Sequence, residues 1–312
     1  MSRPSSSFSP SSWPDPWLVA AWALAATSRL RVAAAHRAGT TAPTAAARSL
    51  ATLDRLSGGR AAAHVIVGSS DADVLRDGDP LGKSDRYRRA GEYLEVFRRS
   101  LTEQQGSDHE GEFSSIRDAL SGLRAQPRGE LLSFGGSSPE GLDLAPRHAE
   151  AYAIAPLPVP ATRRRIAEVR SAAAEHGRTL RIWRHITLVL GPSDEEAAAR
   201  ARRITQDALR LTSGPASARW TEAVQLDRDR ERGRSDPARG PEQVVAYIRR
   251  SLAAAFVGSP DSVAERIGVL RSAGVDIVQL DMAVETDEDR ELRRALVGRL
   301  RSPHSAGRRR GW

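Results

Sequence analysis

A turn of small residues follows a short apolar run near the middle of the chain. Leu131 to Phe134 predicts a brief strand, and Gly135-Gly-Ser-Ser138 leads from it into a helix. Backbone N–H groups at the start of a helix, together with the hydroxyls of Ser137 and Ser138, suit a phosphate dianion. The alternative is an ordinary strand–turn–helix connection in which a serine caps the helix. The residues alone leave both interpretations open.

Strand and helix patterns alternate along the chain on either side of this turn. The strands are expected at 30–36, 61–67, 131–134, around Tyr152, at 180–190 and at 275–280. The helices are expected from Asp15-Pro16 to about Thr27, and then at 43–56, 86–101, 161–176, after the Ser193/Glu196 capping box, from 260 to Gly274, and at 287–300. Pro after a capping residue begins several of these helices, and Gly ends several.

Strands about 30 residues apart with helices between them predict βαβ units and a parallel sheet. A closed barrel and an open doubly wound sheet both fit this order. No GxGxxG segment follows a strand, which disfavours a dinucleotide-binding fold. Six strands are two fewer than a closed eight-stranded barrel contains.

The basic charge of the chain does not indicate a nucleic-acid-binding protein. The formal charge is +8, from 47 basic and 39 acidic residues, and Lys83 is the only lysine. Arginines are interleaved with acids, as at 227–232, whereas a nucleic-acid site needs clustered, unpaired charge. The chain has no Cys, which excludes disulfides and zinc–thiolate sites, and its seven His show no metal-binding spacing, so we expect no metal.

The two ends differ in composition from the body of the chain. Residues 1–12 are rich in Ser and Pro and lack an apolar signal-peptide core, and residues 302–312 form a basic tail, so both are expected to be disordered. Residues 13–301 are expected to form one domain, with a mobile insertion near 212–240. No apolar run approaches the roughly 18 residues of a membrane span. We expect a cytoplasmic protein without membrane contact.

Four segments resemble the bacterial luciferase-like flavin monooxygenases, and most of all the alkanesulfonate monooxygenases. They are Asp15-Pro-Trp-Leu-Val-Ala-Ala21, Ala42 to Arg60 with Thr-Leu-Asp-Arg-Leu-Ser-Gly-Gly-Arg at its end, Ser133-Phe-Gly-Gly-Ser-Ser138, and Phe256 to Ile267. The resemblance spans about 15–300 and is weak across 200–245. The segment that ends at Arg60 is the most specific of the four.

The resemblance implies an α/β fold of the TIM-barrel-like (β/α)8 type, here lacking the first two βα units of the family. It implies binding of reduced FMN, supplied by a separate NAD(P)H-dependent flavin reductase, and use of O2 to oxygenate a small organic substrate. For an alkanesulfonate the products would be an aldehyde and sulfite. Relatives are commonly homo-oligomers.

The resemblance also assigns residues to the flavin side of the site. Gly136, Ser137 and Ser138 match the turn near the flavin phosphate, and Tyr87 matches a tyrosine near that phosphate. Tyr87 also begins an apolar helical stripe, so core packing is its rival role. His64 takes the place of a usual Asn near the flavin ring, and Val67 that of a Thr. The alternative for His64 is a structural role.

The substrate side departs further from the family. Sulfonate enzymes carry Arg and then His on one strand, where this chain has His185 and Thr187, which share a strand face. His185 could bind an anion or act as an acid or base. Arg249 matches a loop arginine, with a solvated helix arginine as the alternative. Trp13, Ala155 and Ala283 replace a usual Cys, Trp and Tyr.

Three functional hypotheses follow from this pattern. The first is a reduced-FMN-dependent monooxygenase similar to the sulfonate enzymes. The second is a flavin- or deazaflavin-dependent oxidoreductase of the same superfamily that transfers hydride without O2. The third is a truncated flavin-binding remnant without catalysis.

Overall fold

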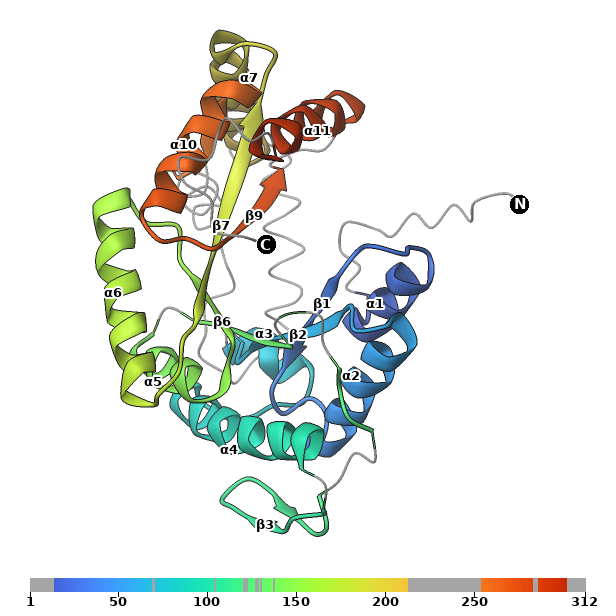
Figure 1. Ribbon diagram of the computed structural model, residues 1–312. Helices are drawn as coiled ribbons and strands as arrows, with labels where there is room; N and C mark the ends of the chain where they lie inside the picture. Colours follow the sequence, from blue (N-terminus) through green and yellow to red (C-terminus); the bar gives the residue numbers. More distant parts are fainter. Residues whose placement is uncertain are drawn as a thin grey trace. The chain divides into compact units, whose positions relative to one another are not determined.

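The computed structural model describes residues 14–68, 71–103, 105–119, 123–126, 129, 131–136, 138–212, 254–282 and 286–301 (Figure 1). The chain forms two compact units, Met1–Ala151 and Tyr152–Trp312. Strands and helices alternate in both units, as the sequence predicts.

Three parallel strands organise the first unit. They are β1 (Val32–Arg37), β2 (Ala61–Ile66) and β5 (Leu132–Gly135), in the order β1-β2-β5. The register sets Ala35 opposite His64 and His64 opposite Ser133. The helices of this unit are α1 (Pro16–Ala25), α2 (Pro43–Ser57), α3 (Asp71–Arg76), α4 (Lys83–Thr102) and α5 (Pro139–His148).

The two faces of this sheet differ in burial. Ala34, Ala63, Val65 and Phe134 are buried on one face. Their neighbours along the strands, such as Ala35 and His64, belong to the other face and are exposed or half-buried. Because successive side chains of a strand point to opposite faces, helix packing on one face leaves the other for polar groups.

Local signals fix the ends of the first helices. The Asp15 carboxylate accepts a hydrogen bond from the Leu18 N–H at 2.9 Å and so caps α1. Gly58 ends α2 in the left-handed conformation, at φ 68°. Leu18 and Trp22 on α1 remain exposed, at 73% and 68%. Lys83, the first residue of α4, and Glu140, the second residue of α5, are also exposed.

Arg60 joins three segments of the first unit. Its guanidinium donates to the carbonyls of Ser57 at 2.8 Å, Leu30 at 2.8 Å and Leu24 at 2.9 Å. Ser57 is the last residue of α2, Leu30 lies just before β1, and Leu24 lies in the last turn of α1. The last arginine of the most family-specific segment therefore works as a structural clamp.

A buried polar chain lies behind β1. His36 Nε2 and the Tyr93 hydroxyl are 2.6 Å apart, and the Trp17 indole N–H donates to His36 Nδ1 at 3.3 Å. Burial lowers the pKa of His36 to about 4, so the ring is neutral at neutral pH. A neutral imidazole can accept one of these bonds and donate in the other.

The second unit is built on one long strand. β7 (Arg181–Leu190) pairs in parallel with both β8 (Phe256–Gly258) and β9 (Ile277–Met282). The helices of this unit are α6 (Val159–Glu175), α7 (Asp194–Thr212), α10 (Pro260–Ser272) and α11 (Asp287–Arg301). The short β6 (Ala151–Ile154) lies at the boundary between the two units.

All six expected strands are present, and the structure adds elements that the sequence analysis did not predict. The polar stretch after α4 contains an antiparallel hairpin of β3 (His109–Glu110) and β4 (Ser115–Ile116). Helix α3 and strand β8 were also not predicted. These elements are too short or too polar for periodicity to reveal them. Most of the expected insertion at 212–240 and both expected disordered ends lie outside the described residues.

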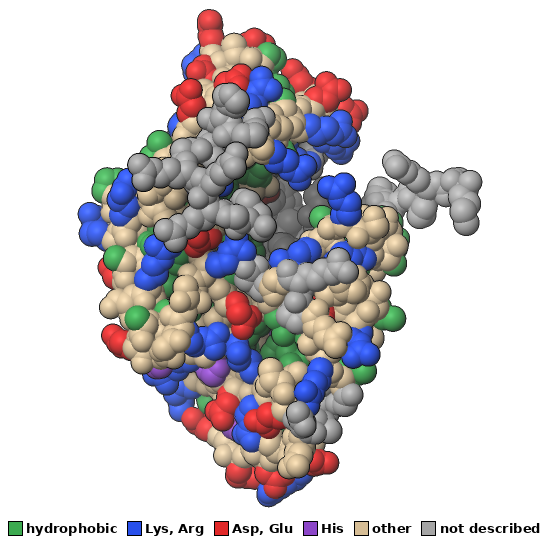
Figure 2. Space-filling model, viewed as in Figure 1, with side chains coloured by type: hydrophobic (Ala, Val, Ile, Leu, Met, Phe, Trp, Pro, Cys, Tyr) green, Lys and Arg blue, Asp and Glu red, His purple; other side chains and the backbone are tan. Residues whose placement is uncertain are grey.

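Charged side chains of both signs mix on the surface drawn in Figure 2. Arg88 pairs with Asp85 at 2.6 Å and with Glu112 at 2.5 Å, and Arg299 pairs with Asp261 at 2.6 Å. Exposed pairs of this kind contribute little to stability, but they interleave the basic charge with acids. Among the described helices, none is long and apolar enough to cross a bilayer.

Replacing Arg60 by Ala should destabilise the first unit by about 3 kcal/mol, because the substitution leaves three carbonyls without their donor. Urea unfolding of the full chain measures this change. The exposed Arg55→Ala on α2 is the matched control and should change stability by less than about 0.5 kcal/mol. Equal effects of the two substitutions would contradict the clamp.

Candidate functional site

His64 lies in the middle of the open face of the first sheet. Its Nδ1 is 2.9 Å from the Ser133 hydroxyl on the neighbouring strand β5. Ser133 also lies within 3.4 Å of the Ala63 carbonyl, to which its hydroxyl donates. In that arrangement Nδ1 carries the imidazole proton and donates to Ser133, because a neutral ring has one N–H and one acceptor. Burial lowers the pKa of His64 to about 4. His64 is therefore a neutral, oriented polar group near the carboxyl end of β2.

Tyr87 and Gly136 lie together although 49 positions separate them. A Cβ added at Gly136 would lie 2.9 Å from the Tyr87 hydroxyl oxygen. Gly136 also approaches Gly141 of α5, since a Cβ on Gly141 would lie 3.5 Å from the Gly136 Cα. The buried Tyr87 belongs to the first turns of α4, so this contact joins α4 to the turn between β5 and α5. Glycine at 136 allows the approach.

Ser138 caps α5, as one of the two interpretations of this turn expected. Its hydroxyl oxygen accepts from the Gly141 N–H at 3.4 Å. The Glu140 carboxylate bonds to its own backbone N–H and to Ser138, and these bonds lower its pKa. A carboxylate thus occupies the anion position at the start of α5. Because Glu140 is exposed, its side chain can leave that position for another anion.

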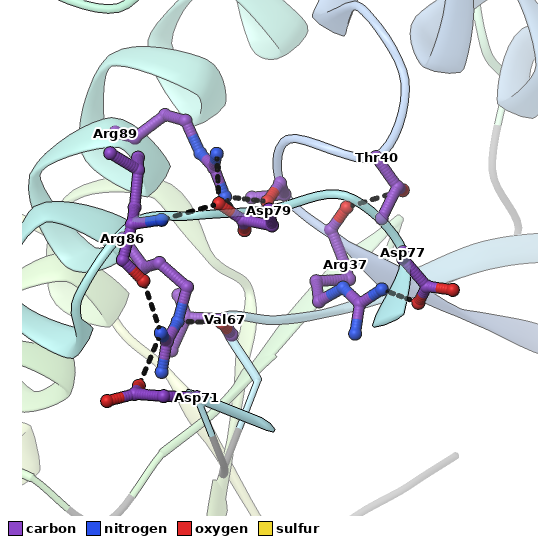
Figure 3. Close-up of polar contacts among 10 residues, drawn as sticks. Arg37, Thr40, Val67, Asp71, Asp77, Asp79, Arg86 and Arg89 are labelled. Carbon is purple, nitrogen blue, oxygen red and sulfur yellow. Dashed lines mark hydrogen bonds and ion pairs between the residues drawn. The ribbon is translucent and has the colours of Figure 1, made fainter. Parts of the chain in front are cut away.

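Arg86 is a buried guanidinium next to Tyr87 in the sequence (Figure 3). Its Nε donates to the Val67 carbonyl at 3.0 Å, and its Nη1 donates to Asp71 at 2.6 Å and to the Leu81 carbonyl at 2.7 Å. Its Nη2 is buried and has no partner among the described residues. A buried donor without a partner costs about 1–3 kcal/mol, so a nearby anion would stabilise this arrangement.

Further arginine pairs hold the segment between β2 and α4 (Figure 3). Arg89 bonds to both carboxylate oxygens of Asp79, at 3.0 and 2.5 Å, and to the Ala38 carbonyl at 3.1 Å. Arg37 pairs with Asp77. These bonds fix the loops that follow the carboxyl ends of β1 and β2, where sites gather in parallel α/β folds.

The second unit carries its own polar cluster. His185 and Thr187 lie two residues apart on β7 and share its half-exposed face, as predicted. In the register of β7 and β9, Thr187 lies opposite Asp281. His185 Nε2 is 3.1 Å from an Asp281 carboxylate oxygen. A His paired with a carboxylate has an oriented ring whose other nitrogen can exchange a proton.

Three residues of these clusters were not predicted from the sequence, and four of the residues that the resemblance points to lie outside the described part of the chain. Ser137, Arg249, Trp13 and Ala283 lie outside the described residues. Arg86, Ser133 and Asp281 were missed. An arginine within the buried stripe of a helix was a signal for Arg86, and a carboxylate at the end of the last strand was a signal for Asp281. Ser133 had no signal of its own.

The low pKa of His64 makes folding stability depend on pH. As the pH falls below 6.5 the unfolded His64 takes up a proton, while the folded ring stays neutral until about pH 4. The unfolded state then binds more protons, so stability falls between pH 6.5 and about 4. Between pH 7 and pH 5, the free energy of unfolding should therefore fall by about 2 kcal/mol less in His64→Asn than in the unchanged protein.

Urea unfolding at the two pH values measures this difference. The exposed His176→Asn is the control and should keep the pH dependence of the unchanged protein. The same loss of stability in His64→Asn and in the unchanged protein would show that His64 is not held neutral.

Several solved structures share the fold of this chain. EDTA monooxygenase from Chelativorans sp. BNC1 matches with TM-score 0.72 and 20% identity, over 94% of this chain and 79% of that one. Riboflavin lyase with modified FMN and riboflavin matches with TM-score 0.72 and 22% identity, over 94% and 75%. An F420-dependent secondary alcohol dehydrogenase matches with TM-score 0.65 and 16% identity, over 92% and 84%.

These structural similarities establish the fold, and a match to a family model establishes the protein family. The model of the luciferase-like monooxygenase family matches residues 3–277, which is most of the chain. The expected TIM-barrel-like α/β fold is thereby confirmed. The family sequence signals and the parallel βα order agree with this match. The chain belongs to the luciferase-like monooxygenase family.

Proposed function

We propose that this protein is the oxygenase component of a two-component system that uses reduced FMN and O2 to oxygenate a small anionic organic substrate, such as an alkanesulfonate. The observation that carries the FMN assignment is the contact between Tyr87 and Gly136 at the turn before α5. This contact brings a hydroxyl to the start of a helix, which is a favourable place for a phosphate.

The other residues of the first unit support a flavin phosphate at this turn. Ser138 offers a hydroxyl there. In this proposal the phosphate takes the place of the exposed Glu140 carboxylate, with Gly136 allowing close approach. Ser137 belongs to the same proposed site through its place in the sequence.

His64 and the second unit supply the remaining roles. Reduced flavin, when bound, supplies the electrons that activate O2. His64 stays neutral and offers a fixed hydrogen bond to the flavin ring. His185, held by Asp281, binds the substrate anion or moves a proton, and Thr187 offers a hydroxyl on the same strand face. Arg249 is proposed as a further cation for the substrate.

The proposal includes partners and a location. An NAD(P)H-dependent flavin reductase supplies reduced FMN, and both proteins work in the cytoplasm. A homo-oligomer is proposed as well. The exposed Leu18 and Trp22 on α1 support self-association, because exposed apolar patches are typical of protein-binding surfaces.

A comparison of reduced FMN with reduced riboflavin tests the phosphate site. Under anaerobic conditions, quenching of tryptophan fluorescence should show micromolar binding of reduced FMN. Reduced riboflavin, which lacks the phosphate, should bind at least about tenfold more weakly, because a charge-assisted phosphate contact is absent. In Tyr87→Phe and Ser138→Ala this preference should shrink.

Ser49→Ala on α2 is the control and should keep the full preference. Equal binding of the two flavins by the unchanged protein would refute the phosphate site at this turn. Binding of reduced F420 in place of reduced FMN would favour the hydride-transferring alternative, which the similarity to an F420-dependent enzyme keeps open.

A turnover assay tests the role of His185. With flavin reductase, FMN, NADPH and O2, sulfite release is measured for alkanesulfonates of two to ten carbons. His185→Gln should lower kcat about 100-fold, as for loss of an acid–base group, and Asp281→Asn should lower it less. Neither should change the dissociation constant of reduced FMN. Full turnover of His185→Gln would contradict this role, and His176→Gln is the control.

A further inference from the structure

A cavity of about 520 Å³ lies within the second unit, on the face of β7 opposite His185. Arg184 lines it, and adjacent strand residues point to opposite faces, so the cavity is separate from the cluster of His185 and Thr187. Its volume is within the range of pockets that bind small molecules. The described residues that line it include Pro156, Leu157, Phe256, Val269 and Leu270.

The inner wall of the cavity carries a buried cation. Arg184 is 4% exposed, and its Nη2 donates to the Leu157 carbonyl at 2.7 Å. Its Nε and Nη1 are buried and have no partner among the described residues. Arginine stays protonated in proteins, so this site buries a positive charge without a carboxylate among the described residues. Such a charge is costly unless an anion neutralises it.

A second arginine lies nearer the solvent. The exposed Arg266 lies over the Phe256 ring, 4.2 Å from its centroid, while Arg184 lies 5.8 Å from the same centroid. Arg266 donates to the Val257 carbonyl at 3.2 Å and to the Ala255 carbonyl at 3.5 Å, and it interacts electrostatically with Asp194, which does not line the cavity. The two cations share one aromatic ring and leave the remaining wall mostly apolar.

We propose that this cavity binds a small amphiphilic carboxylate, with the carboxylate on Arg184 and Arg266 and the apolar tail along Leu157 and Leu270. A guanidinium matches the two oxygens of a carboxylate with two parallel donors. The apolar wall favours a hydrocarbon tail, because burial of each CH2 group contributes about 0.8 kcal/mol. This site goes beyond the proposed monooxygenase reaction.

Octanoate is the probe for this site. Isothermal titration calorimetry of the full chain should show saturable binding of one octanoate. Octanol has the tail without the charge, and acetate has the charge without the tail. Each should bind at least tenfold more weakly than octanoate. Bound octanoate should raise the Tm, because it binds only the folded state.

Substitutions locate the binding within the cavity. Arg184→Met should weaken octanoate binding at least tenfold and should keep or raise the Tm of the free protein, since it removes an unpaired buried charge. Val269→Trp should also weaken binding by filling the cavity, with both arginines retained. Arg271→Met, at an exposed position on the same helix α10, is the matched control and should bind octanoate normally.

Three results would overturn the proposal. They are octanoate affinity unchanged in Arg184→Met, octanol binding as tight as octanoate binding, and displacement of octanoate by reduced FMN. Reduced FMN binding should be the same in Arg184→Met and in the unchanged protein. A failure of the flavin assignment would therefore be seen separately from a failure of this one.

Discussion

The two-residue period of the buried strands is the constraint on which both units depend. On β2 and β5 it sends Val65 and Phe134 into the core and places the half-buried His64 and the buried Ser133 together on the other face. Arg184 and His185 are consecutive on β7, yet the period sends them to opposite faces. Parallel pairing then brings polar residues of neighbouring strands together, as with His185 and Asp281. A one-residue shift in register would bury the polar groups and expose the apolar ones.

Buried arginines have different roles because their partners differ. Arg60 donates to three carbonyls and ties helix ends to a strand. Arg86 shares its donors between carbonyls and a carboxylate, and keeps one N–H without a described partner. Arg184 has one carbonyl partner, and two of its donor nitrogens have no partner among the described residues. The number of unsatisfied donors thus separates a structural arginine from those that fit an anion.

The sequence predicted the order of the main elements, because capping residues and buried periodic runs are local signals. Asp15, Gly58 and the apolar run of β7 each act within a few residues. The three-residue β8 and the β3–β4 hairpin depend on pairing with distant partners and leave no such signal. At the site, spacing placed His185 and Thr187 on one face.

The contacts across the chain could not be derived in the same way. The approach of Tyr87 to Gly136 depends on how α4 packs, and the partner of His185 depends on the register of β7 and β9. The family resemblance pointed to Tyr87 and to the turn, but it did not indicate the partners Ser133 and Asp281. Residues that act through a partner are seen only when the partner is known.

The single lysine of the chain gives the first unit a natural chemical handle. Lys83 is exposed and begins α4, four positions before Tyr87. All other basic side chains are arginine or histidine. An amine-reactive dye would therefore attach to the Lys83 side chain and to the α-amino group alone. A protease specific for lysine would cut the polypeptide at one position. Labelling and peptide mapping could therefore report on the start of α4 without any engineered residue.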